Sequence, residues 1–271
     1  MAESVCFATP RKLPKARELR GRVAVLDIAF ASETGGASFE TVTLPFIDAL
    51  GARLAAWVDH HDSTHHERYR GNPRFVLATK AQHGACPEMV TPELVARLGP
   101  VDTIVCHSDF DGLATAAKWQ RGGVEPYPGC DDDARAIDTR IGTPSAIGLR
   151  FDRALRARPR DAALFGVIVR HLTSGLADDS LWEPIDRAGD DLAPLEAEAR
   201  RLARGYRLLG DVAFVDATGR RGPYEKTLLL LLGQDEVAAA RRSLAAVADE
   251  GGLTAAATRA FVAYAEGQPA A

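Results

Sequence analysis

The sequence predicts an α/β fold, in which a mainly parallel sheet is flanked by helices, followed by a smaller C-terminal α+β domain. Three observations lead to this prediction. Short apolar runs alternate with segments of helical spacing in the first half of the chain. Polar residues follow the apolar runs directly, which is where parallel sheets bind ligands. Beyond Pro144 the pattern changes to longer helical segments.

Four apolar runs are expected to form strands, because each is short and is followed by a polar residue or a turn. They cover residues 23–26, 53–58, 75–78 and 101–106. Segments with helical spacing lie between or after them and end at glycine, over residues 38–50, 91–98 and 113–120. This alternation is typical of a sheet whose parallel strands are joined by helices.

The two ends of the chain differ from this pattern. Residues 1–20 are basic and contain proline, so we expect a solvated tail. Helices are expected over 145–158, 162–176, 191–209, 235–248 and 254–265, and strands over 212–215 and 227–232. Acidic residues, proline and glycine interrupt the pattern near 178–190. We therefore predict a first domain over 20–180 and a small C-terminal domain over 190–271, for which ligand binding is left open.

Composition excludes several classes of protein. The chain has 271 residues, 46% of them hydrophobic, and a net charge of -4, so no global basic field attracts duplex DNA. The four cysteines do not form C-x-x-C pairs, and reduced thiols are expected. The longest apolar run, 228–232, is far too short to cross a bilayer. These features favour a cytoplasmic protein.

The strongest chemical signal is the segment Asp59-His60-His61-Asp62-Ser63-Thr64-His65-His66, which holds four of the seven histidines. Carboxylate together with imidazole suits Mn, Fe, Co or Zn better than Ca. A solvated polar loop is the alternative. It explains His65 and His66 well, but it explains Asp59, His60 and His61 poorly, because these follow a strand directly.

The second signal is His107-Ser108-Asp109-Phe110-Asp111-Gly112. In an extended chain the two aspartates point to the same side and can reach neighbouring cations. Gly112 allows a turn or a close approach of the backbone. The alternative is a helix N-terminus, where capping accounts for one aspartate only. Asp27 and Asp138 are weaker signals alone, and Asp131-Asp132-Asp133 is expected to be a solvated loop.

Together these motifs resemble the DHH phosphoesterase family, which includes RecJ-type exonucleases, nanoRNases and manganese-dependent family II pyrophosphatases. Asp59-His60-His61 matches the motif that names the family, and 107–112 resembles its Asp-x-Asp-Gly motif. Val25-Leu26-Asp27 resembles its strand-end aspartate, Asp138-Thr139 its Asp-Thr motif, and 83–90 its following helix start. The resemblance covers roughly residues 20–180.

The chain departs from this family in two respects. The Asp-x-Asp motif comes first in most relatives, but here it follows Asp-His-His, so the motif order is permuted. Permutation preserves a site when the new termini lie in exposed loops. The glycine-rich Gly-Gly-Gly-His loop of many relatives is absent from the C-terminal part.

The resemblance implies a role for each site residue. Asp27 would bridge two divalent cations, Mn²⁺ by preference, with Mg²⁺ or Co²⁺ as alternatives. His107 and Asp109 would bind one cation, and Asp111, His60 and Asp138 the other. Asp59 would orient a neighbour or bind metal, and His61 would contact the phosphate or leaving group. Arg140 is expected to face the substrate. Arg220, Arg221 and Lys226 offer a further phosphate contact, although a solvated hairpin tip explains them equally well.

The expected activity is metal-dependent hydrolysis of a phosphodiester or other phosphate ester, with a small nucleotide or short oligonucleotide as substrate. Neither a membrane nor a stably bound long duplex is expected, and a homodimer is left open. One alternative is a non-catalytic nucleotide-binding regulatory relative. Another is a helical HD-type phosphohydrolase using His61 and Asp62, which would have to lie on helices.

Overall fold

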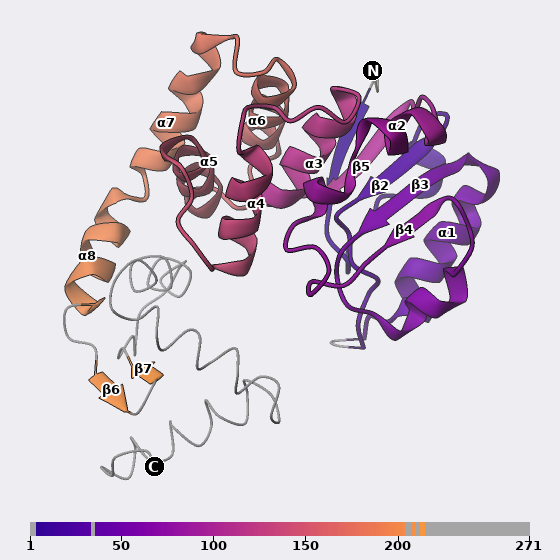
Figure 1. The fold of residues 1–271 in the computed structure, drawn as a ribbon, viewed down its shortest axis with the longest axis horizontal. Helices are drawn as coiled ribbons and strands as arrows, with labels where there is room; N and C mark the ends of the chain where they lie inside the picture. The colour runs from indigo at the N-terminus through magenta and orange to yellow at the C-terminus, as the bar shows by residue number, and fades with distance from the viewer. Residues whose placement is uncertain (1–3, 34–35, 204–206, 210–211, 215–271) are drawn as a thin grey trace. The chain divides into compact units, whose positions relative to one another are not determined.

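The computed structural model describes residues 4–33, 36–203, 207–209 and 212–214 (Figure 1). The chain divides into two compact units, the first made of Met1–Thr139 and Pro144–Asp190, the second of Arg140–Thr143 and Asp191–Ala271. Every element named below up to α7 belongs to the first unit. None of the helices in the described part of the chain combines the length and apolar character needed to span a bilayer.

A five-stranded parallel sheet forms the centre of the first unit, with strand order β1-β5-β2-β3-β4. The strands are β1 (Ser4–Ala8), β2 (Val23–Leu26), β3 (Leu54–Asp59), β4 (Phe75–Leu77) and β5 (Thr103–His107). The predicted α/β class and parallel sheet are confirmed for this unit. Strand β2 lies between β3 and β5, and its four residues are buried, as expected of a central strand.

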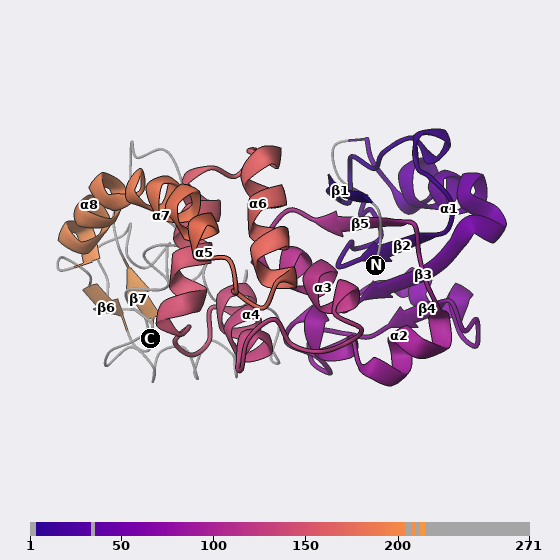
Figure 2. The same ribbon diagram turned by 90° about the horizontal axis from the view of Figure 1, so that it is seen from above.

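Alternate residues of the strands face two separate hydrophobic cores. Val23 and Val25 pack on the face covered by α1 (Leu44–Leu50), which the π-helical turn η2 (Phe39–Thr43) precedes. Ala24 and Leu26 pack on the opposite face, against α2 (Pro92–Leu98), α3 (Phe110–Gln120) and α6 (Ala162–Thr173). Figure 2 shows α1 and α2 on opposite sides of the sheet. The sheet is therefore a buried middle layer.

A group of helices continues the first unit beyond α3. It contains α4 (Cys130–Thr139), α5 (Ala146–Ala157), α6 and α7 (Trp182–Asp190), with α5 packed against α7 and α6 against α3. Figure 2 shows α3 between the sheet and these helices. Short 3-10 turns complete the unit: η1 (Ala16–Glu18), η3 (Gly51–Arg53), η4 (Thr64–Tyr69), η5 (Cys86–Met89) and η6 (Asp179–Leu181).

Three sequence predictions are corrected here. The N-terminal 20 residues are not a solvated tail, because Ser4–Ala8 pairs with β5 and the side chains of Ala16 and Leu19 are buried. The predicted break at 178–190 contains the helical elements η6 and α7, and the division between the two units follows at its end, after Asp190. The 131–133 segment is the first turn of α4, and the Asp133 carboxylate is buried, accepting hydrogen bonds from Tyr127 and Ser145.

The second unit is described in part. It contains α8 (Ala193–Ala203) and an antiparallel pair of strands, β6 (Arg207–Leu209) and β7 (Val212–Phe214). The predicted helix over 191–209 therefore ends earlier, and its last residues form β6. The elements predicted over 227–232, 235–248 and 254–265 lie outside the described residues, so the predicted C-terminal domain stays a prediction.

Candidate metal centre

Three polar motifs meet at the carboxyl edge of the sheet because their strands are in register. Leu26 of β2 pairs with Val58 of β3 and with Cys106 of β5. The next residue of each strand is Asp27, Asp59 and His107, so the three lie at one level. The permuted motif order does not separate the motifs in space. Strand β5, which leads into residues 107–111, neighbours β2, which leads into Asp27.

Asp27 occupies the centre of this cluster and is strained. Its φ is +55°, a left-handed conformation that costs a residue with a side chain about 1 kcal/mol. Its backbone N–H donates to the Val58 carbonyl at 2.8 Å, which holds the turn. Its side chain is buried, yet neither carboxylate oxygen accepts a hydrogen bond among the described residues. A buried carboxylate in this state either takes up a proton or is compensated by a cation.

His60 places a ring nitrogen between two carboxylates. Its Nδ1 lies 2.9 Å from the His83 carbonyl, which can only accept, so Nδ1 carries the proton and donates it. Nε2 then presents a lone pair 3.4 Å from Asp27 Oδ1 and 3.1 Å from Asp111 Oδ2. Three electron-rich atoms that face one another are repulsive unless a proton or a metal ion lies among them.

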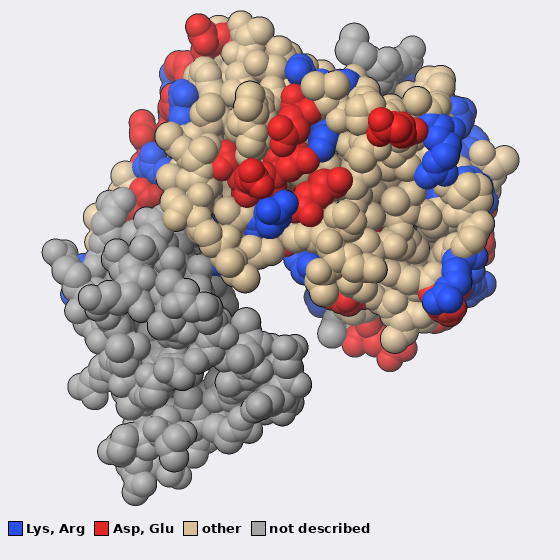
Figure 3. Space-filling model, in the orientation of Figure 1, with Lys and Arg blue, Asp and Glu red and all other residues tan. Residues whose placement is uncertain are grey.

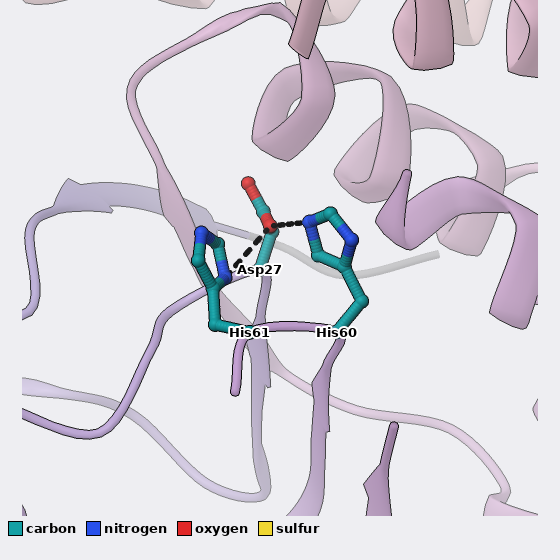
Figure 4. A group of neighbouring side chains, drawn as sticks. All are labelled: Asp27, His60 and His61. Atoms are coloured by element: carbon teal, nitrogen blue, oxygen red, sulfur yellow. Dashed lines mark ion pairs between the residues drawn. The ribbon is translucent and has the colours of Figure 1, made fainter. Parts of the chain in front are cut away.

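The pKa of His60 also indicates that a positive charge is favoured at Nε2. Burial lowers this pKa, but the adjoining carboxylates of Asp111 and Asp27 outweigh burial and raise it to about 11. Without a metal ion, the cluster therefore draws a proton onto Nε2. Figure 4 shows the rings of His60 and His61 on either side of the Asp27 carboxylate.

Asp59 orients His61. Asp59 is fully buried, and its Oδ1 lies 2.8 Å from His61 Nδ1, which donates to it. This bond leaves Nε2 of His61 as the acceptor, or as the donor when the ring is protonated. The His61 side chain is 29% exposed, whereas His60 is fully buried. His61 is thus the histidine of the pair that a substrate can reach.

The 107–112 motif is arranged differently from the extended form expected. Asp109 caps α3, accepting from the Gly112 N–H at 3.1 Å, and Asp111 lies in the first turn of that helix. Both carboxylates still reach the cluster. His107 Nδ1 lies 2.8 Å from Asp109 Oδ2 and 3.7 Å from Asp27 Oδ2. The helix-capping alternative thus describes the backbone correctly.

Asp111 is the most firmly held ligand candidate. It is 2% exposed, and the Cys86 backbone N–H donates to its two oxygens at 3.0 and 3.2 Å. Burial raises its pKa to about 6, and the His60 hydrogen bond opposes the rise. Cys86 begins η5, at the segment expected to resemble a helix start. That segment therefore supplies a hydrogen-bond donor to the cluster.

Gly112 is required by close packing. A β-carbon at this position would lie 2.5 Å from the His107 carbonyl oxygen, and its φ is not in the left-handed region. The first turn of α3 thus lies directly against the end of β5. This close approach sets where His107, Asp109 and Asp111 lie relative to one another.

Asp138, at the end of α4, joins the cluster from the other side. Its Oδ2 lies 2.5 Å from the Lys80 ammonium. Together with His60 and Asp111 it forms one of three groups whose donor atoms lie within 4.8 Å of one another. The other groups are Asp27 with His107 and Asp109, and Asp27 with His60 and His61. The group of Asp27, His60 and His61 shares Asp27 with one of the other two groups and His60 with the other, an arrangement that fits two neighbouring cations.

Charge repulsion within the cluster is consistent with this fit. Burial is the main cause that raises the pKa of Asp27, and the charges of Asp111, Asp109 and Asp59 raise it further. Mixed imidazole and carboxylate donors suit Mn²⁺, Co²⁺, Fe²⁺ or Zn²⁺. The donor chemistry and the unpaired oxygens of Asp27 are therefore compatible with a transition-metal centre.

The predicted substrate contacts are Arg140, Arg220, Arg221 and Lys226. Arg140 belongs to the second compact unit, and Arg220, Arg221 and Lys226 lie outside the described residues. His65 and His66 were expected to be solvated, but both are half-buried. The His65 ring stacks on Phe39 at 4.1 Å, and the His66 ring packs edge-on against Phe30. These contacts anchor the loop that follows His61.

Sequence reasoning missed three contributors. The His83 carbonyl and the Cys86 N–H act through the backbone, which has no residue-specific signal. Lys80 pairs with Asp138 across 58 positions of the chain, a contact that no local pattern reveals.

Comparison with known proteins gives no match. No protein-family model, curated protein or solved structure matches this chain.

Proposed function

We propose that this protein is a metal-dependent phosphoesterase of the DHH type that hydrolyses a phosphate ester of a small nucleotide. The observation that carries the proposal is the arrangement around His60, whose Nε2 lies 3.4 Å from Asp27 and 3.1 Å from Asp111. With Nδ1 donating to His83, this geometry favours a metal ion among the three side chains. The sheet also joins the four motifs in one cluster despite their permuted order.

The ligands would divide as the resemblance implies. Asp27 would contribute to both cations, with His107 and Asp109 at one and His60, Asp111 and Asp138 at the other. Cations held there would supply an activated water and positive charge that neutralises the phosphoryl oxygens. The Cys86 N–H and the His83 carbonyl orient Asp111 and His60, as outer contacts of metal ligands commonly do.

His61 would contact the substrate. Asp59 holds its Nδ1–H, so Nε2 is directed to the phosphate or the leaving group. The carboxylate fixes both the ring orientation and the tautomer. When the ring is protonated, Nε2 of His61 would donate a proton to the leaving oxygen or a hydrogen bond to a phosphoryl oxygen.

The HD-type alternative is disfavoured by the backbone. It requires helical His and Asp, whereas Asp59 ends β3 and the following residues through Asp62 are not helical. Acidic side chains gather on the face shown in Figure 3, around α3 and α4. That face does not attract a long duplex, which supports a small substrate.

The proposal is tested with Asp111→Asn, which retains one oxygen for the Cys86 N–H and removes the charge. Wild type and variant are assayed with Mn²⁺, Mg²⁺ or EDTA on short RNA and DNA, cyclic dinucleotides, pyrophosphate and a nitrophenyl diester. Asp132→Asn is the control, because the Asp132 side chain is 78% exposed and lies outside the cluster.

We expect Mn²⁺-dependent hydrolysis that falls by about a thousandfold or more in Asp111→Asn and is unchanged in Asp132→Asn. Metal content, measured by mass spectrometry, should fall in the same variant. Hydrolysis at the wild-type rate in Asp111→Asn would refute the metal assignment. Bound metal without hydrolysis of any substrate would indicate a phosphate ester outside this set, whereas neither bound metal nor hydrolysis would favour the regulatory nucleotide-binding alternative.

A further inference from the structure

Lys118 is a buried positive charge that the metal centre does not explain. It lies in α3, where every residue from Phe110 to Trp119 is buried, and its side chain is only 8% exposed. Its ammonium donates to the Pro87 carbonyl at 2.9 Å and to Asp131 Oδ2 at 2.5 Å. Lysine is rarely this buried unless its charge is paired, so these two contacts are what hold the ammonium inside the protein.

The contact with Pro87 attaches α3 to η5 at a second point. About two turns before Lys118 on α3, the Asp111 carboxylate accepts hydrogen bonds from the Cys86 N–H. Cys86 and Pro87 are the first two residues of η5. A single contact would leave η5 free to turn about it, whereas two contacts fix its direction. The hydrogen bond that orients Asp111 therefore depends on Lys118.

The contact with Asp131 attaches α3 to α4, the helix that supplies Asp138. Asp131 lies in the first turn of α4, and its Oδ1 is buried without a hydrogen-bond partner among the described residues. Burial raises the pKa of Asp131, and the ammonium of Lys118 opposes the rise. Lys118 thus compensates the buried carboxylate and sets where the start of α4 lies against α3.

A second ion pair joins η5 to α4, but it lies at the surface. Arg135 Nε is 2.5 Å from Glu88 Oε1, and the Arg135 side chain is 50% exposed. Such exposed pairs contribute little, because water screens them. A buried ion pair also adds little net stability compared with apolar side chains of similar volume. The role of Lys118 is therefore better explained by the elements that it positions.

We propose that Lys118 is a positioning residue for the cation site of His60, Asp111 and Asp138, acting through η5 and α4. The inference rests on the proposed function for the identity of this cluster as a metal site. Charge alone predicts the opposite effect, because removing a positive charge tightens cation binding. Loss of positioning weakens it, so the direction of the change separates the two effects.

The test uses two variants of the contact and one control. Lys118→Met keeps the apolar stem and removes the ammonium. Adding Asp131→Asn removes the carboxylate charge left unpaired, so this double variant should recover stability without restoring the contact with Pro87. Ile185→Ala is the control, because Ile185 is fully buried in α7, which packs against α5 and α6, and its truncation lowers stability there.

Three quantities are measured for each protein. Urea unfolding with EDTA gives stability, and calorimetry gives manganese affinity under conditions where every variant is folded. Hydrogen exchange of the Cys86 amide, followed by NMR in the metal-free protein, reports the orienting hydrogen bond directly. The exchange measurement and the affinity do not depend on finding a substrate.

We expect both Lys118 variants to weaken manganese binding by about 10- to 100-fold and to speed exchange of the Cys86 amide. The weakening should persist in the double variant although stability recovers, and Ile185→Ala should bind manganese as the wild type does. This result supports the inference whether or not the wild type hydrolyses a substrate.

Unchanged or tighter manganese binding in the Lys118 variants would overturn the inference, and hydrolysis by the wild type would leave the proposed function standing. Equal weakening in Ile185→Ala would also overturn it, since loss of stability alone would then account for the effect. A wild-type protein that binds no manganese would overturn both.

Discussion

Replacing Gly112 by alanine should disturb the metal centre through packing alone. The added β-carbon would lie 2.5 Å from the His107 carbonyl oxygen and 2.8 Å from the His107 carbonyl and β-carbons. Because two of these are backbone atoms at a strand end, the start of α3 must shift. Overpacking of this kind costs about 1–3 kcal/mol of unfolding free energy.

Gly166 provides the matched control, because it lies inside α6 and an added β-carbon there meets no atom within 4 Å. Gly166→Ala should stabilise the protein by about 0.5–1 kcal/mol, as alanine restricts the unfolded chain. The same substitution is thus expected to have opposite signs at the two glycines, with a difference of about 1.5–4 kcal/mol.

Urea unfolding followed by circular dichroism, with EDTA present, measures this difference without any metal contribution. Manganese binding, measured by calorimetry, should then weaken by about 10- to 100-fold in Gly112→Ala, because His107, Asp109 and Asp111 are displaced together. If Gly112→Ala were as stable as Gly166→Ala and bound manganese normally, the close packing of α3 against β5 would not set the site geometry.

Two further predictions concern the helical part of the first unit. Asp133→Ala removes the acceptor of three hydrogen bonds, from Tyr127 Oη at 2.7 Å and from Ser145 N and Oγ at 2.6 Å, and should cost about 3 kcal/mol in urea unfolding. A cost below about 1 kcal/mol would show that water replaces the carboxylate. Burial lowers the pKa of His171, so as the pH decreases this histidine takes up a proton in the unfolded chain before it does so in the folded protein. Its contribution to stability should therefore be full above about pH 6.5 and fall as the pH decreases below that value. His171→Phe should remove this component, and an unchanged difference between melting temperatures at pH 8 and pH 5 would contradict the assignment.

The sheet and the core of the site follow from local sequence patterns. The apolar run before Asp27 and the run before Asp59 are continuous because both strands are buried on two faces. The positions of Asp27, Asp59 and His107 at strand ends follow from the same runs. Register aligns these residues, and the parallel arrangement brings them to one edge.

The wrong predictions share a cause, which is stabilisation by residues distant in sequence. Strand β1 is short and only half-buried, and its partner residues lie in β5, about a hundred positions away. Asp133 is buried because Tyr127 and Ser145 satisfy its oxygens. A run of acidic residues does not reveal such partners, so a solvated loop was the natural expectation.

The pairing of β1 with β5 has a consequence for protein synthesis. Residues 4–8 leave the ribosome well before residues 103–107, their only neighbours in the described sheet. Strands β2, β3 and β4 can assemble in order as they emerge, whereas β1 must wait with unpaired backbone groups, a state prone to aggregation. Ala8 pairs with His107, so the edge of the sheet that carries the candidate metal centre is completed late, by a segment translated early.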